Sequence, residues 1–220
     1  MKFFVSLVIV VSLFLGTTMN PQAATTTTKT TVKLDMPYKS QLTPVYAPFG
    51  CEGVSLLMAL HYKGYTNIST KKFLDGLPKS KNNPFLGFAS GNPYKNVNGV
   101  FQSIFPAPLT KYGKKYSKKV TNAQGYSVSK LKLELKKGNP VVVYVTLDFQ
   151  SPKLAKWPMG SAGRVKTVDN MHVVTLIGYN QTGYYVADPN RKSSKKGKYW
   201  VSKTKFENAY NSLKYAVIVS

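Results

Sequence analysis

The sequence is short of the side chains on which most enzymes rely for chemistry. Its 220 residues include one cysteine, Cys51, two histidines, His61 and His172, and eight acidic residues. One cysteine cannot close an internal disulfide, and two distant histidines with one cysteine make no ligand cluster. We therefore expect no disulfide, no metal ion and no cofactor, and few candidates for any catalytic role.

The chain also lacks an apolar run long enough to cross a membrane. The apolar stretch from Phe3 to Leu15 is too short for a span, and it follows a single positive residue, Lys2. Small residues follow it, which is the pattern of a secretory signal peptide cut after Ala23 or Ala24. We expect residues 1–24 to be removed and the mature protein to be secreted or associated with the cell wall; a retained N-terminal anchor is the alternative.

Negative charge and arginine are both scarce. Thirty-one basic residues stand against eight acidic ones, and Arg164 and Arg191 are the only arginines. Removal of Lys2 with the signal changes the net charge from +23 to +22 (+23 − 1). Proteins that recognise nucleic-acid sequence usually contact base edges and phosphates with arginine, so we expect no specific nucleic-acid partner. Lysine runs at 111–119 and 191–198 suit loose attraction to anionic cell-wall polymers, or they are only a solvated face.

The order of the predicted elements indicates an α+β domain over residues 34–220, after a polar linker at 25–33. Helical patterns come first, and strand patterns with β-branched and aromatic residues follow. We expect helices at 51–63, about 70–77 and 127–138, strands at 140–147, 171–179, 183–188, 198–203 and 214–220, and a short helix near 204–212. Helices followed by a meander of antiparallel strands define this class. The segment 80–106 is too long for a mere connection and is a candidate wall of a binding site.

Cys51 stands at the predicted start of a buried helix. Unpaired N–H groups and the helix dipole at such a start lower a thiol pKa and favour the nucleophilic thiolate. Gly50 removes a side chain just before the sulfur and gives a ligand room to reach it. An inert buried thiol and an intermolecular linker are the other interpretations.

A thiol nucleophile needs a base, and the two histidines differ in reach. His61 lies ten residues along the same helix, about 15 Å from Cys51, and is expected to be a packed helix residue. His172 begins a strand and is the candidate base, with an ordinary strand histidine as the alternative.

The base needs an acceptor to fix its tautomer. Asp188 ends the strand that pairs with the strand of His172 across a hairpin turn near 181–183, and it is the preferred partner. Asp169, three residues before His172, is the competitor. Each has a structural alternative as a turn residue.

These segments resemble the papain-like cysteine peptidases, in the group related to bacteriocin-processing double-glycine peptidases. The resemblance lies in "MPYKSQLTPVYAPFGCEGVSLLMALHYKG", "KLKLELKKGNPVVVYVT" and "NMHVVTLIGYNQTGYYVADPN". It implies a papain-like fold with N-terminal helices on a C-terminal antiparallel sheet. By resemblance Cys51 is the nucleophile, His172 the base and Asp188 its orienting partner. Gln41, within "KSQL", is implied as the residue that helps hold the oxyanion.

The resemblance implies a cysteine peptidase that acts on a peptide or protein, and the signal-peptide pattern indicates that this peptidase is exported. We expect a monomer. The loops at 80–106 and 148–170, the latter with Trp157, are expected to line the substrate cleft. The chain departs from the family pattern at Glu52, whose carboxylate opposes thiolate formation unless it points to solvent. The alternative function is a catalytically idle peptidase fold that binds cell-wall polyanions or peptides.

Overall fold

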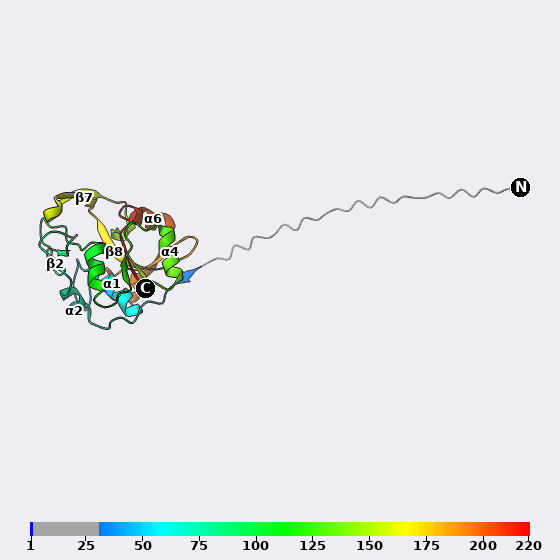
Figure 1. Ribbon diagram of the computed structural model, residues 1–220, viewed down its shortest axis with the longest axis horizontal. Coiled ribbons are helices and arrows are strands. Elements are labelled where there is room, and N and C mark those ends of the chain that lie inside the picture. Colours follow the sequence, from blue (N-terminus) through cyan, green and yellow to red (C-terminus); the bar gives the residue numbers. More distant parts are fainter. Residues whose placement is uncertain (2–30) are drawn as a thin grey trace.

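The computed structural model describes Met1 and residues 31–220, so the expected signal peptide and most of the linker lie outside the described residues. The described chain has an α+β fold (Figure 1). The helices are α1 (Cys51–Tyr62), α2 (Thr70–Asp75), α3 (Pro106–Gly113), α4 (Val128–Lys136), α5 (Ser194–Gly197), α6 (Lys203–Asn211) and the short 3₁₀ turns η1 (Leu147–Phe149) and η2 (Gly160–Ala162). No helix among the described residues is both long and apolar enough to traverse a bilayer.

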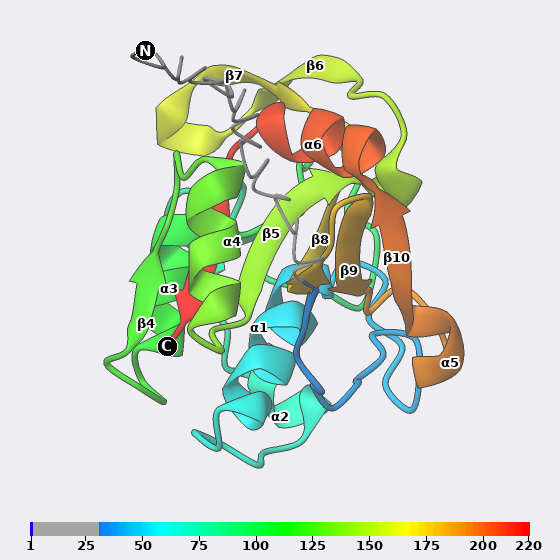
Figure 2. The same ribbon diagram turned by 90° about the vertical axis from the view of Figure 1, so that its right-hand side faces the viewer.

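The strands form one large sheet and two small ones. They are β1 (Val32–Lys33), β2 (Lys79–Ser80), β3 (Phe88–Ala89), β4 (Val120–Asn122), β5 (Val141–Thr146), β6 (Leu154–Pro158), β7 (Arg164–Val168), β8 (Met171–Tyr179), β9 (Gly183–Ala187), β10 (Lys198–Ser202) and β11 (Ala216–Val219). The large sheet has the order β10-β9-β8-β5-β11-β4, and β1 pairs with β8. Figure 2 shows β5, β8, β9 and β10 side by side.

The expected meander is correct for four strands and wrong for the last. β5, β8, β9 and β10 follow one another across the sheet, but β11 lies on the far side of β5 and does not pair with β10. The chain crosses the sheet through α6, whose Phe206 and Tyr210 are fully buried. Burial of these aromatic side chains over the sheet holds the crossover in place.

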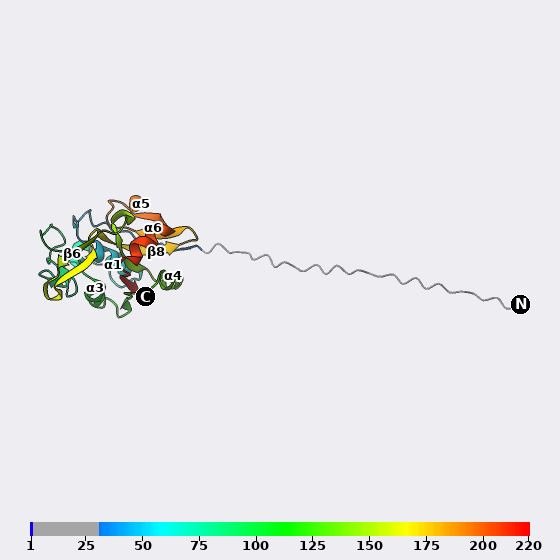
Figure 3. The same cartoon turned by 90° about the horizontal axis from the view of Figure 1, so that it is seen from above.

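Helices cover both faces of the large sheet. On one face α1, α2 and α3 pack against Val142, Tyr144 and Val173 in a single apolar cluster. On the other face α4 and α6 pack against the alternate residues of the same strands. In the view from above, α3 and α5 lie on opposite sides of the molecule (Figure 3). Alternate residues of β5 and β8 therefore face two different cores, and this explains why both strands are mostly apolar and buried along nearly their whole length.

Helix α1 is buried over most of its length, as its sequence predicts. Residues 51–60 are all buried, and Gly64, with φ of +71°, follows the helix. The Ser55 hydroxyl donates to the Val173 carbonyl oxygen (3.2 Å), and the Thr175 hydroxyl donates to the Ser55 carbonyl oxygen (2.9 Å). Further along, Met58 packs with Ile177. Helix α1 thus runs in the same direction as β8, and Cys51 lies level with the start of that strand.

Several elements were not foreseen. The sequence did not predict α3, the β6–β7 hairpin or the short strands β1 to β4, and the predicted linker extended to Lys33. In the structure Val32 and Lys33 pair with Tyr179 and Gly178 of β8, so they belong to the sheet. Two-residue pairings carry no hydrophobic period that could reveal them.

Candidate active site

His172 and Asp188 form the buried polar pair of the site. His172 Nε2 lies 2.7 Å from Asp188 Oδ1, and their side chains are 6% and 2% exposed. The two residues come together because β8 and β9 form an antiparallel hairpin with Thr175 opposite Ala187. With Nε2 engaged by the carboxylate, Nδ1 is the ring nitrogen that can accept a proton from elsewhere.

Asp188 is fixed by donors from three directions. Its Oδ2 accepts from the Tyr199 hydroxyl at 2.8 Å, and its Oδ1 also accepts from the Asn190 backbone N–H at 2.9 Å. Arg191 Nη2 lies 3.7 Å from Oδ2. Burial acts to raise the pKa of Asp188, but the hydrogen bond and charge of His172 and the Tyr199 hydroxyl outweigh it and lower the pKa to about 2. The carboxylate is therefore ionised and its orientation is set.

The competing histidine and acid are engaged elsewhere. His61 Nε2 lies 3.2 Å from the Ile68 carbonyl oxygen, on the outer half of α1, as expected of a packed helix residue. Asp169 Oδ1 accepts the indole N–H of Trp157 at 2.8 Å. Of the two acids considered, Asp188 is the one that the structure places at His172.

Cys51 begins α1 and is 9% exposed. The backbone N–H of Val173, the residue after His172, acts to lower the thiol pKa. Burial, the largest effect, and the charge and hydrogen bond of Glu52 act in the other direction and raise the pKa of Cys51 well above its ordinary value. The helix start therefore does not by itself produce a thiolate in this structure.

Glu52 explains why the expected activation is absent. Its side chain does not point to solvent: it is 1% exposed, and its Oε2 accepts a hydrogen bond from the Cys51 thiol at 3.3 Å. Burial raises the pKa of Glu52, whereas the Ser103 hydroxyl and the backbone N–H of Glu52 itself, at the helix start, act to lower it. Glu52 thus occupies the positive end of the helix that a Cys51 thiolate would otherwise use. Within the described residues, the thiol donates to Glu52 and forms no hydrogen bond with His172.

Gln41 is buried close to the segment that carries the thiol. Its Nε2 donates to the Pro48 carbonyl oxygen (2.9 Å), and its backbone N–H donates to the Pro189 carbonyl oxygen (2.9 Å). Its Oε1 is buried and has no hydrogen-bond partner among the described residues. Gln41 therefore joins the loop before Cys51 to the chain just after Asp188.

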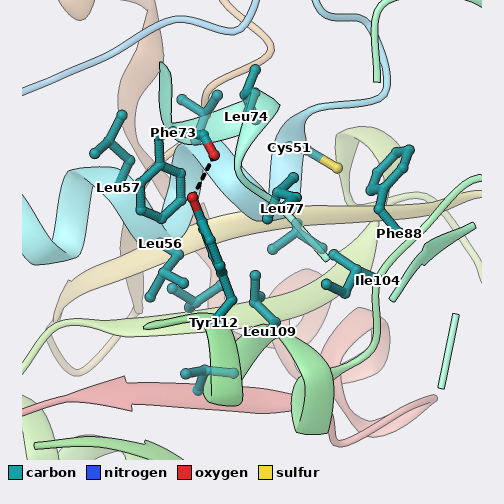
Figure 4. Packing of buried hydrophobic residues seen from close by; sticks show 14 of the residues in the cluster. Cys51, Leu56, Leu57, Phe73, Leu74, Leu77, Phe88, Ile104, Leu109 and Tyr112 are labelled. Atoms are coloured by element: carbon teal, nitrogen blue, oxygen red, sulfur yellow. Dashed lines mark hydrogen bonds between the residues drawn. The ribbon is translucent and has the colours of Figure 1, made fainter. Parts of the chain in front are cut away.

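Gly50 and Gly53 allow close packing around the thiol. A Cβ at Gly53 would lie 2.5 Å from Leu74 Cδ2, and one at Gly50 would lie 3.1 Å from the Ala47 Cβ. Gly50 is expected from the sequence to give a ligand access to the sulfur. The structure adds a second reason for glycine at this position: a side chain there would crowd Ala47 and Leu74 of α2. Figure 4 shows the sulfur of Cys51 beside Phe88 and Leu77 within this cluster, and, to the left, the hydrogen bond from the Tyr112 hydroxyl to the Phe73 carbonyl oxygen.

The two long loops meet near the thiol. Trp157 of the 148–170 segment packs on Phe101 of the 80–106 segment, with ring centroids 5.8 Å apart. The backbone N–H of Phe49, two residues before Cys51, donates to the Pro93 carbonyl oxygen at 3.1 Å. Both loops are therefore attached to the core cluster that contains Cys51.

Comparison with known proteins gives the family. The model of the Peptidase_C39 like family matches residues 33–218. The chain belongs to this family. A crystal structure of a putative C39-like peptidase from Bacillus anthracis superposes with a TM-score of 0.75 at 29% identity, over 87% of this chain and 98% of that one.

Two further matches are an uncharacterized protein of similar sequence and a solved structure of lower similarity. The uncharacterized protein YvpB of Bacillus subtilis (strain 168) is 28% identical over 182 residues, which cover 77% of this chain and 68% of that protein. A double glycine motif protease from an AMS/PCAT transporter, solved with its leader peptide, matches with a TM-score of 0.46 at 16% identity over 86% of this chain and 92% of that one. The family match and the Bacillus anthracis structure confirm the predicted papain-like α+β fold and its relation to the C39 group.

Proposed function

We propose that the protein is an exported cysteine peptidase that uses Cys51, His172 and Asp188. The observation that carries the proposal is the buried 2.7 Å pair of His172 and Asp188, at the end of the sheet where α1 begins with the chain's only cysteine. Membership of a C39-like peptidase family supports an amide bond as the target. The substrate is a peptide or protein.

In the proposed reaction the thiol gives its proton to Nδ1 of His172 while the sulfur attacks the amide carbonyl carbon. His172 then passes that proton to the leaving amine as the C–N bond breaks, which leaves an acyl thioester on Cys51. Water, deprotonated by His172, hydrolyses the thioester and restores the thiol. Asp188 stays ionised throughout and stabilises the imidazolium.

Gln41 is proposed to assist at the oxyanion. A side-chain amide and the backbone N–H of Cys51 would donate to the oxygen that becomes negative in the tetrahedral intermediate. Gln41 is buried and is held at Pro48 and Pro189, between the thiol and the Asp188 segment. A fixed donor of this kind loses little entropy as the reaction proceeds.

The test is cleavage of a pool of synthetic peptides, followed by mass spectrometry for new amino termini. The full chain should cleave a subset of the pool, and Cys51→Ala should cleave none while it unfolds at the same temperature as the wild type. Equal cleavage by Cys51→Ala would contradict the proposal.

A second candidate function, attachment to anionic cell-wall polymers, has an observation of its own. Of the eight acidic residues, Glu52 and Asp188 are buried, so six remain to offset 31 basic residues. Four of the six, Asp35, Asp75, Glu134 and Asp148, are paired with Lys198, Lys71, Lys137 and Arg191. Each ion pair removes one charge of each sign, so the large excess of basic side chains is left without acidic partners. Attraction of this excess to a polyanion is compatible with peptidase activity in the same molecule.

A further inference from the structure

Glu52 is a buried acid for which the proposed reaction has no role. Two donors converge on its Oε1, the Ser103 hydroxyl at 2.6 Å and the Ile104 backbone N–H at 3.3 Å. Its Oε2 accepts from the Cys51 thiol at 3.3 Å. The Ile104 N–H can only donate, and the Ser103 hydroxyl and the Cys51 thiol can each turn a hydrogen toward the carboxylate. Burial raises the pKa of Glu52, and these three donors are what the ionised form needs inside the protein.

The groups that hold Glu52 are themselves fixed. Ser103 is fully buried, and its carbonyl oxygen accepts from the Ala89 N–H at 2.8 Å. The Ile104 carbonyl oxygen accepts from the Tyr144 hydroxyl of β5 at 2.5 Å. The carboxylate is therefore anchored both to the 80–106 loop and, through Ile104, to the central sheet.

The 80–106 loop is also internally organised next to this anchor. The side chain of Gln102 donates to Ser90 Oγ and to the carbonyl oxygens of Asn92 and Lys95, all within 2.9 Å, and accepts from the Val97 N–H at 2.6 Å. One side chain thus folds the stretch from 90 to 97, and the next residue along the chain binds Glu52. A change in the conformation of residues 90–102 would therefore displace Ser103, and with it the hydrogen bond that holds the carboxylate of Glu52.

Within residues 31–220, the titratable groups that act on the thiol and on Glu52 include no neutralising lysine or arginine. Tyr144 approaches from β5, with a pKa raised by burial and by the charges of Glu52 and Cys51. From the segment after β9, the charge of Asp188 acts on the sulfur in the same direction as that of Glu52. His172, at the start of β8, is bound to Asp188. Nothing in this set offsets the effect of Glu52 on the thiol.

We propose, as an addition that rests on the proposed peptidase function, that Glu52 is a positioning residue that holds the Cys51 thiol protonated in a resting orientation, turned toward Oε2 of Glu52 and away from His172. The proton stays on sulfur as long as the thiol donates to Glu52. For the reaction to begin, the S–H must turn from Oε2 to Nδ1 of His172, and the same proton is then transferred to the imidazole.

The test is the pH dependence of alkylation of Cys51 by iodoacetamide in the full chain, followed by intact-mass spectrometry, because alkylation requires no substrate. Removal of the charge with Glu52→Gln should shift the midpoint of the rate profile to lower pH by about one unit or more. Glu134→Gln, which removes a carboxylate on α4, is the matched control and should leave the midpoint unchanged. Equal midpoints for the wild type and Glu52→Gln would overturn the proposal, since a merely structural role would change the melting temperature and not the midpoint.

Ser103→Ala keeps the proposal testable if Glu52→Gln does not fold. The carboxylate that has lost one donor should accept more strongly from the thiol, so the midpoint should rise. A midpoint equal to that of the wild type would overturn the proposal. The two proposals can fail separately. If the midpoint falls in Glu52→Gln but the wild type cleaves no peptide, the role of Glu52 at the resting thiol is supported and the proposed peptidase function is rejected.

Discussion

The imidazole of His172 and the carboxylate of Asp188 meet 2.7 Å apart across the β8–β9 hairpin, and both side chains are almost fully buried. A buried pair of this kind makes the folded state sensitive to protonation of the carboxylate. The pKa of Asp188 in the folded chain is about 2, below the ordinary value of an aspartate.

Acid should therefore cost the wild type more stability than it costs Asp188→Asn. A depressed folded-state pKa contributes stability that is present above the unfolded-state pKa near 4 and is lost as the pH falls through about 2. The loss should be about 2 kcal/mol of unfolding free energy between about pH 5 and about pH 2, from roughly 1.4 kcal/mol per pKa unit. Urea unfolding at the two pH values measures it.

Asp35→Asn is the control for this effect, because Asp35 is fully exposed. It should lose as much stability in acid as the wild type does. If Asp188→Asn lost the same amount as well, the His172–Asp188 pair would not stabilise the folded state in the way described.

The two histidines provide a matched pair of variants for catalysis. His172→Ala should reduce peptide cleavage by about 10²-fold or more, because general-base assistance is worth that much. His61→Ala should keep most of the activity, since His61 is bound at the Ile68 carbonyl oxygen within the outer part of α1. Initial rates on one cleaved peptide compare the two, and similar losses in both variants would argue against His172 as the base.

Gln41→Ala should lower kcat by about 10²-fold and change KM little, because an oxyanion donor acts mainly in the transition state. Gln124→Ala, an exposed glutamine, is the control. Steady-state kinetics on the same peptide separate the two constants. A rise in KM with unchanged kcat would place Gln41 in substrate binding instead.

Attachment to a polyanion should be reversed by salt. We expect the mature protein to bind purified cell walls at low ionic strength and to elute as salt rises, because screening shortens the reach of its lysines. Cys51→Ala should bind equally well, since the thiol is buried. Binding that is indifferent to salt would show that the positive surface is not responsible.

Much of the site could be predicted because its signals are local. The apolar length of α1 and the glycine after it place Cys51 at a helix start, and the hairpin spacing brings Asp188 to His172. Asp169 could be excluded as the partner of His172 only in the structure, where its carboxylate accepts a hydrogen bond from the indole N–H of Trp157. These features depend on neighbours within a few tens of residues.

The direction of Glu52 could not be predicted from its neighbours. Its partner Ser103 is 51 residues away and lies in a loop without periodicity. The same limit applies to β11, which inserts next to β5 because α6 crosses the sheet, and to α3, whose first turn begins with Pro106 after Phe105. In each case a distant contact decides the outcome, and no local pattern of residues encodes it.

The most direct measurement is an acid quench of the full chain with a cleaved peptide, followed by intact-mass spectrometry and mapping of the modified residue. We expect a transient mass increase equal to the acyl half of the peptide, located on Cys51 and absent from His172→Ala. Cleavage without any adduct on Cys51, or an adduct that forms equally fast in His172→Ala, would contradict a cysteine nucleophile served by the His172–Asp188 pair.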